Sequence, residues 1–253
     1  KVENFLNSPF DSINFGNISN TKIKDDTFIY WGDEPVGKLK KGNSIYKPIA
    51  DALNSEYLSS ENKLLVSAKL QKWLDKEIDD TLNPLTKNLD ENINSEIRAI
   101  AFNCIENFGN FPIEKFKDSL KTISQESKIQ LSKLGIRIGA KYFFMPNLLK
   151  KKPIELCAIL WKTFFPNKTD SFLPLPTNGR VSFTSEINMP NSYWQSIGYI
   201  NFKNFLFRID VFEKIFFLAR HKLKKGPFLE SSDLMNPIGC NSNQLRDIMV
   251  FCG

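Results

Sequence analysis

The stretch Leu134–Phe165, LGIRIGAKYFFMPNLLKKKPIELCAILWKTFF, decides how the chain is expected to fold. Gly135 stands where a C′ glycine ends a preceding helix. The alternating, aromatic IRIGAKYFF that follows is typical of a strand or a hairpin. Pro146 and Asn147 then end this segment, so the sequence predicts a helix stop, a short β segment and a turn.

A buried helix is expected directly after that turn. Three lysines lead to Pro153, which occupies a first-turn position that proline tolerates. From Ile154 to Phe165 only three residues are polar, namely Glu155, Lys162 and Thr163. A helix with so few polar positions is predicted to be buried nearly all round.

The net charge of +6 is concentrated around the same stretch. Residues 1–134 sum to −2, residues 135–168 to +6 and residues 169–253 to +2. We expect the basic residues to form one face that follows the phosphates of a single strand. The alternative is a solvated loop beside a helix start. The predicted nucleic-acid-binding residues are Arg137, Lys141, Lys150, Lys151 and Lys152, joined by Arg180 from the next loop.

Aromatic residues near this face are candidates for stacking on bases. The nearest are Tyr142, Phe143 and Phe144. Alternation along a strand directs at least one of them into the core.

Length and composition indicate a protein with a sizeable core. The chain has 253 residues, of which 42% are hydrophobic and 13% aromatic. No run approaches the roughly 18 apolar residues of a membrane span, and the first residues lack a signal-peptide layout, so a cytoplasmic protein without a membrane partner is expected.

The sequence predicts reduced core thiols and no metal site. It has four cysteines without CxxC spacing, Cys104, Cys157, Cys240 and Cys252, and a single histidine, His221.

The first two thirds of the chain are expected to be mainly helical. Residues 1–26 are interpreted as a linker or the end of a preceding domain, and residues 27–60 as a β-hairpin module. Residues 61–165 are predicted to form a helical bundle with a basic centre. Its helices are expected at Glu61–Leu82, from Asp90 to Phe108, and from Pro112 through Leu134.

The last third begins with a long Pro-rich loop, residues 166–190, a length typical of functional or disordered loops. Residues 191–253 are predicted to hold a strand at Phe202–Phe207 and a helix to Leu223 capped by Asp210 and Glu213. Two short helices joined at Gly239 follow, and Asn241 with Gln244 is predicted to cap the second. Together these helices have helix-turn-helix proportions. The unit is expected to be truncated.

The predicted fold class is therefore mainly α. It comprises a helical bundle, more than half helix, with a small N-terminal β-hairpin, a short central β segment and a terminal helix-turn-helix-like unit. No phosphate-binding GxxxxGK[ST] loop, GxGxxG turn, HExxH motif or nucleophile placed with a histidine occurs. No catalytic residue and no cofactor are expected within this chain.

The order of several motifs resembles a known family. These are WGDEPVGKL, KLGIRIGAKYFFMPNLLKKKPIELCAILW, NGRVSF, SIGYINFKNFLFRIDVFEKI and DLMNPIGCNSNQLRDIMVFCG. From about Thr27 to Gly253 the chain resembles the region C-terminal to the helicase core in alphaproteobacterial helicase-like proteins. These are similar to the mitochondrial degradosome RNA helicase, a superfamily-2 DExH enzyme.

The resemblance implies a catalytically inert accessory module of an ATP-dependent helicase. Such a region packs on upstream RecA-like domains of the same polypeptide and completes the tunnel for a single strand of nucleic acid. ATP and magnesium would belong to those upstream domains. RNA and DNA both remain open as the strand, and two other functions stay open: a dimeric helix-turn-helix DNA-binding regulator, and a non-catalytic helical scaffold for protein partners.

Overall fold

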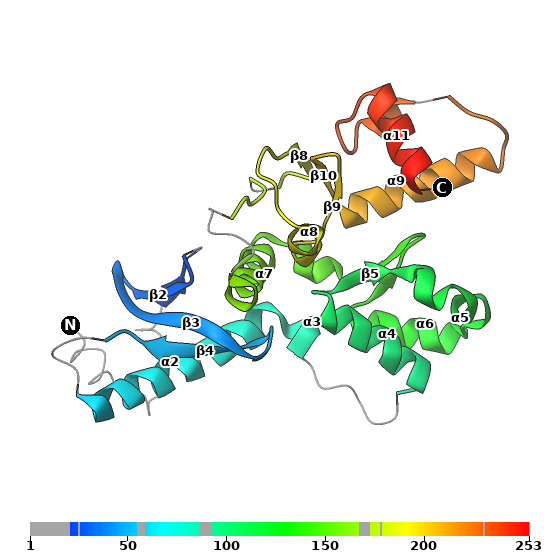
Figure 1. Ribbon diagram of the computed structural model, residues 1–253. Helices are drawn as coiled ribbons and strands as arrows, with labels where there is room; N and C mark the ends of the chain where they lie inside the picture. The colour runs from blue at the N-terminus through cyan, green and yellow to red at the C-terminus, as the bar shows by residue number, and fades with distance from the viewer. Residues whose placement is uncertain are drawn as a thin grey trace. The chain divides into compact units, whose positions relative to one another are not determined.

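The computed structural model describes residues 21–24, 26–54, 59–86, 93–166, 173–177, 179–229 and 231–252, without the side chains of the last two (Figure 1). Of these residues 52% are helical and 20% lie in strands, which form three small antiparallel sheets. The fold is mixed α/β, so the prediction of a mainly α helical bundle is wrong. The strands that were not predicted have three to six residues, too few for alternation to mark them.

The chain divides into two compact units. The first comprises the chain up to Asn83 with Leu156–Leu173, and the second comprises Pro84–Glu155 with the chain from Pro174 onward. The division falls inside helix α7 (Lys151–Phe164).

The first unit is built on a four-stranded sheet in the order β1-β2-β3-β4. The hairpin predicted within residues 27–40 is confirmed as strands β2 and β3, but the sequence did not predict β1 or β4. Part of the expected linker is thus a strand. The four strands are β1 (Thr21–Ile23), β2 (Phe28–Trp31), β3 (Glu34–Ser44) and β4 (Lys47–Ala52).

Helix α2 (Ser60–Thr81) covers this sheet and confirms the helix predicted there. Two of its side chains satisfy backbone N–H groups of the edge strand β4. Gln71 Oε1 accepts from Ala50 at 2.9 Å, and Ser67 Oγ accepts from Ala52 at 3.0 Å. Two N–H groups of this edge are therefore satisfied by the helix and not exposed for pairing with another strand.

The helical part of the second unit is more broken than predicted. Helix α4 is confirmed, but the helix expected from Pro112 through Leu134 is divided, because Ser124 is extended and its hydroxyl accepts the N–H of Ser127 at 3.1 Å to start a new helix. The elements are α3 (Asn83–Thr86) at the division, α4 (Ser95–Glu106), the 3-10 helix η2 (Ile113–Phe116), α5 (Lys117–Thr122) and α6 (Gln125–Lys133).

The central β segment is a three-stranded sheet in the order β5-β7-β6. Gly135 has φ +80° after α6, which confirms the predicted helix stop. Strands β6 (Arg137–Ile138) and β7 (Tyr142–Phe144) form the predicted hairpin. Strand β5 (Asn110–Pro112), which lies between two predicted helices and was not predicted, adds to β7. The Phe111 and Phe143 rings stack at 4.8 Å between these two strands.

The predicted buried helix is α7, which follows the 3-10 helix η3 (Pro146–Leu149) and begins two residues before Pro153. Leu156, Leu160 and Trp161 are nearly inaccessible, which confirms the burial expected from the sequence.

The third sheet has the order β8-β10-β9. Its strands are β8 (Ser182–Thr184), β9 (Tyr199–Phe202) and β10 (Phe205–Arg208), with helix α8 (Asn191–Ser196) between β8 and β9. The single strand predicted at Phe202–Phe207 is wrong, because Lys203 and Asn204 both have positive φ and form a hairpin turn there. The predicted loop, 166–190, contains β8; its residues 167–172 and 178 lie outside the described residues.

Three helices end the second unit: α9 (Ile209–Leu223), α10 (Ser232–Met235) and α11 (Ser242–Cys252). Their buried residues form one apolar cluster that includes Phe212, Ile215, Leu234, Leu245 and Ile248. The predicted opening of α11 is confirmed, since Asn241 and Gln244 exchange hydrogen bonds of 2.9 and 3.0 Å.

The predicted cap of α9 is wrong. Arg208 is its N-cap residue and makes no capping side-chain bond. Asp210 instead pairs with Arg208, and Glu213 is buried against another element.

The predicted core thiols are confirmed for Cys104, Cys157 and Cys240, which are free and buried; the side chain of Cys252 lies outside the described residues.

In the part of the chain that the structure describes, no helix is long and apolar enough to cross a membrane.

Candidate functional site

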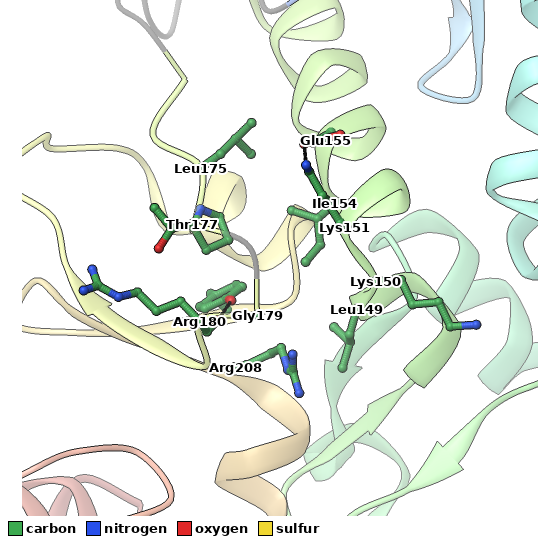
Figure 2. A pocket seen from close by; sticks show the side chains of 12 residues that line it. Leu149, Lys150, Lys151, Ile154, Glu155, Leu175, Thr177, Gly179, Arg180 and Arg208 are labelled. Carbon is green, nitrogen blue, oxygen red and sulfur yellow. Dashed lines mark hydrogen bonds and ion pairs between the residues drawn. The ribbon is translucent and has the colours of Figure 1, made fainter.

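Four cationic side chains line one pocket of the second unit, with a volume of about 330 Å³ (Figure 2). Lys150 and Lys151 come from the start of α7, Arg180 from the segment before β8, and Arg208 from the end of β10. We call this set the cationic pocket. Three of its four cations were predicted from the sequence, and Arg208 was not.

The start of α7 places Lys150 and Lys151 at the pocket. Lys150 is extended, and its carbonyl accepts the N–H of Ile154 at 3.1 Å, so it stands at the N-terminal end of the helix. The first turn of α7 holds no acidic residue. The helix dipole is positive at this end, and the lysines add to that potential, which favours an anion.

The ion pair of Lys151 compensates little of this charge. Its Nζ lies 4.0 Å from Glu155 Oε1, and both side chains are well exposed. An exposed pair of this kind contributes only about 0.3–0.5 kcal/mol. Lys151 therefore remains able to contact a ligand phosphate.

Arg180 is held through its backbone. Its carbonyl accepts the hydroxyl of the buried Tyr199 at 2.6 Å, and its N–H donates to Thr177 at 3.0 Å. Burial raises the pKa of Tyr199 to about 12, so this hydroxyl keeps its proton and donates at neutral pH. The side chain of Arg180 is exposed, and Figure 2 shows its guanidinium on the side opposite the Lys150 amine.

Arg208 is oriented by Asp210. Its Nε and one terminal nitrogen donate to the two carboxyl oxygens at 2.7 and 3.0 Å. This bidentate bond raises the pKa of Arg208. The pair uses two of five N–H donors, so the guanidinium keeps donors for a ligand.

The pocket is apolar between its cations. Leu149, Ile154, Leu175 and Pro176 contribute to its lining. Leu149 and Ile154 lie between Lys150 and the arginines in Figure 2. The arrangement combines an apolar wall with four cations and the single carboxylate of Glu155, a net positive charge that suits a ligand with both anionic and uncharged parts.

The other three predicted residues do not line this pocket. Lys152 follows Lys151 on α7 and is exposed, and Arg137 is exposed on strand β6. Lys141 is half-buried in the β6–β7 turn, where its Nζ lies 5.1 Å from the centre of the Phe216 ring on α9.

A buried carboxyl group holds the turn that carries Lys141. Glu213 of α9 is 5% exposed and accepts the backbone N–H groups of Ala140, Lys141 and Tyr142, the last two at 3.0 and 2.7 Å. Burial raises the pKa of Glu213, and the three hydrogen bonds oppose that rise. The position of Lys141 therefore depends on Glu213.

Two of the three aromatic candidates are core residues. Phe143 and Phe144 are 0% and 6% exposed. Tyr142 is half-buried with its ring edge-on to Phe212, 6.2 Å between centroids. Neither phenylalanine has a ring face available to a base.

Comparisons of the chain with protein-family models, with curated proteins and with solved structures find no match. Among the described residues, no group of three or more His, Cys, Asp or Glu could hold a metal ion. The chemistry that the cationic pocket offers is the binding of an anion by lysine and arginine.

Proposed function

We propose that the chain is a nucleic-acid-binding accessory region that contacts the phosphates of a single strand through the cationic pocket. The observation that carries the proposal is the meeting of Lys150 and Lys151 with Arg180 and Arg208 around one pocket. Arginine and lysine contacts to phosphate supply most of the affinity in sequence-independent binding.

Two further features support an extended anion. The Arg180 guanidinium and the Lys150 amine point to opposite sides with Arg208 between them, which fits successive phosphates better than a single small anion (Figure 2). Arginine presents a planar fork that binds phosphate bidentately, and Arg208 is already oriented by Asp210.

The proposal includes a helicase core as partner. From the resemblance of the sequence, we infer that the region acts with RecA-like domains upstream in the same polypeptide, which would bind ATP and magnesium. In that role the region guides the strand and has no catalytic residue of its own. We further infer a cytoplasmic location.

The test is the salt dependence of binding to a fluorescent single-stranded oligonucleotide, measured by anisotropy in DNA and RNA versions. If the four cations each contact a phosphate, log K falls with log salt with a slope of about −3. Replacing Lys150, Lys151 and Arg180 with Gln is expected to flatten the slope by about 2 without changing sequence preference.

A control variant that loses the same charge elsewhere separates phosphate contact at the pocket from the effect of net charge alone. Lys115, Lys128 and Lys133 are exposed in the same unit, on η2 and α6, and replacing them with Gln removes the same charge. The control variant is expected to keep the wild-type slope to within about 0.5. Equal slopes for both triple variants, or no binding by the wild-type chain, would end the proposal.

The helix-turn-helix regulator has less support than the accessory role. Helix α10 has only four residues, a single turn, and cannot act as the supporting helix of such a motif. A pure protein scaffold predicts no salt-sensitive binding of nucleic acid, so the same titration tests it.

A further inference from the structure

Helix α9 presents an exposed stripe that contains one phenylalanine among basic side chains. Phe217 is 67% exposed. Residues three, four and seven positions apart share a helix face, and the exposed neighbours of Phe217 at these spacings are basic. They are Lys214, Arg220, His221 and Lys224, all exposed.

Phe217 lies outside the face of α9 that packs into the core. The apolar face of α9 is used by Phe212, Ile215 and Phe216, which pack in the apolar cluster of the second unit. The rings of Phe212 and Phe216 contact each other at 5.8 Å. Within the described part of the chain, Phe217 has no aromatic partner.

The exposed positions of this stripe carry no carboxylate of their own, and the acidic residue that pairs with this helix, Asp233, contacts Lys222 outside the stripe at 3.1 Å. The exposed positions hold no aspartate or glutamate, since Glu213 is buried and Asp210 is paired with Arg208. Lys141, held by Glu213, adds a further cation beside Phe216 on the flank of the same helix. Such a concentration of one charge favours an anionic polymer.

We propose that Phe217 is a base-stacking platform and that the cations around it hold the phosphates on either side of the stacked base. The inference rests on the proposed function, and it assigns a second contact for the same class of ligand, a single strand. Single-strand binding typically combines a positively charged track with aromatic rings on which bases stack. Tyr142, Phe143 and Phe144 are the stacking candidates from the sequence, but the two phenylalanines are buried in the core, and we assign the role to Phe217 instead.

A membrane surface fits this stripe less well. Helices that lie in a membrane interface insert a wide apolar face. The apolar face of α9 is occupied by the protein core, and the stripe offers a single large apolar side chain between cations.

The test compares Phe217→Leu and Phe217→Trp with the wild-type chain. The oligonucleotide, about 12 nucleotides long and thus within usual site sizes, carries one 2-aminopurine at varied positions. Phe217→Leu keeps an apolar side chain but loses the aromatic face, and we expect affinity to fall about 5- to 150-fold, as for the loss of one stacked base. The salt slope is expected to stay the same, and Phe217→Trp is expected to restore affinity.

The 2-aminopurine signal gives an independent readout. A stacked 2-aminopurine is quenched, so the wild-type chain is expected to quench it at one or two positions, and Phe217→Leu is expected to lose that quenching. Phe102 is the matched control, since it is 58% exposed on α4, with Glu106 one turn away. Phe102→Leu is expected to leave affinity and quenching unchanged.

Each failure has its own signature. If Phe217→Leu keeps the affinity and quenching of the wild type while the pocket variant still flattens the salt slope, the stacking platform is wrong and the proposed function stands. Absence of any binding by the wild-type chain overturns both proposals. If Phe217→Leu instead reduces only binding to anionic lipid vesicles, or only self-association in gel filtration, the stripe serves a membrane or a second copy and the inference is wrong.

Discussion

The carboxyl group of Glu213 accepts the backbone N–H of Tyr142 at 2.7 Å and thereby joins helix α9 to the β6–β7 turn. The same group accepts the N–H groups of Ala140 and Lys141. A residue whose spacing from Asp210 predicts a helix cap serves a distant segment instead. The turn that carries Lys141 and the helix that carries Phe217 are therefore fixed to each other.

Replacing Glu213 with Ala is expected to lower the free energy of unfolding by about 3 kcal/mol or more. Three backbone N–H groups would lose their acceptor, and each buried unsatisfied donor costs about 1–3 kcal/mol. Glu213→Gln keeps one carbonyl oxygen and is expected to cost about half as much. Urea unfolding measures both, and the exposed Glu106→Ala, expected within about 0.5 kcal/mol of wild type, is the control.

The stability that Glu213 contributes is also expected to depend on pH. Because burial raises the pKa of Glu213 above its ordinary 4.5, the unfolded chain releases this proton first as the pH rises. The contribution of Glu213 is then fully present below pH 4.5 and is lost as the pH rises through the folded-state pKa. Urea unfolding from pH 4 to 7 should show the advantage of wild type over Glu213→Gln shrinking. A growing advantage would mean that the three hydrogen bonds outweigh burial.

Gly139 is required by the approach of the Glu213 carboxyl group. A Cβ at this position would overlap that group, which three hydrogen bonds keep from moving aside. Gly139→Ala is expected to cost about 1–3 kcal/mol in wild type. In the Glu213→Ala background the cost should largely disappear, and a double-mutant cycle measures this coupling. Equal costs in both backgrounds would contradict the stated role of the glycine.

The thiols of Cys104 and Cys157 are expected to resist alkylation in the folded protein. They are 0% and 1% exposed, and burial raises the pKa of both. Iodoacetamide labelling followed by peptide mass mapping should show neither modified natively and both modified in urea. Native labelling at rates near those of a free thiol would show that these segments open readily.

The chain alone is expected neither to bind nor to hydrolyse ATP. Its sequence holds no glycine-rich loop that would present backbone N–H groups to the nucleotide phosphates. Thermal unfolding with and without magnesium and ATP should give the same Tm. Turnover above that of a mock preparation would contradict the accessory role.

Elements with strong local signals were predicted correctly from the sequence. The apolar spacing of α2, the stop at Gly135 and the Asn241–Gln244 box each depend on residues within a few positions of one another. Elements with weak local signals were not predicted. The turn at Lys203 and Asn204 lacks the usual glycine, and β5 has three residues, so neither was predicted.

The sequence by itself determined where the charge is concentrated, which segments are apolar helices and that Lys150 and Lys151 stand at the start of one. Only the tertiary structure decided that Arg180 and Arg208 meet them, that Glu213 holds the β6–β7 turn and that Phe217 is left exposed. Helix periodicity and caps are properties of neighbouring residues, whereas these juxtapositions join segments far apart in the chain. Which distant segments meet depends on the packing of the whole core and on the entropy of closing the loops between them, and a local pattern contains neither.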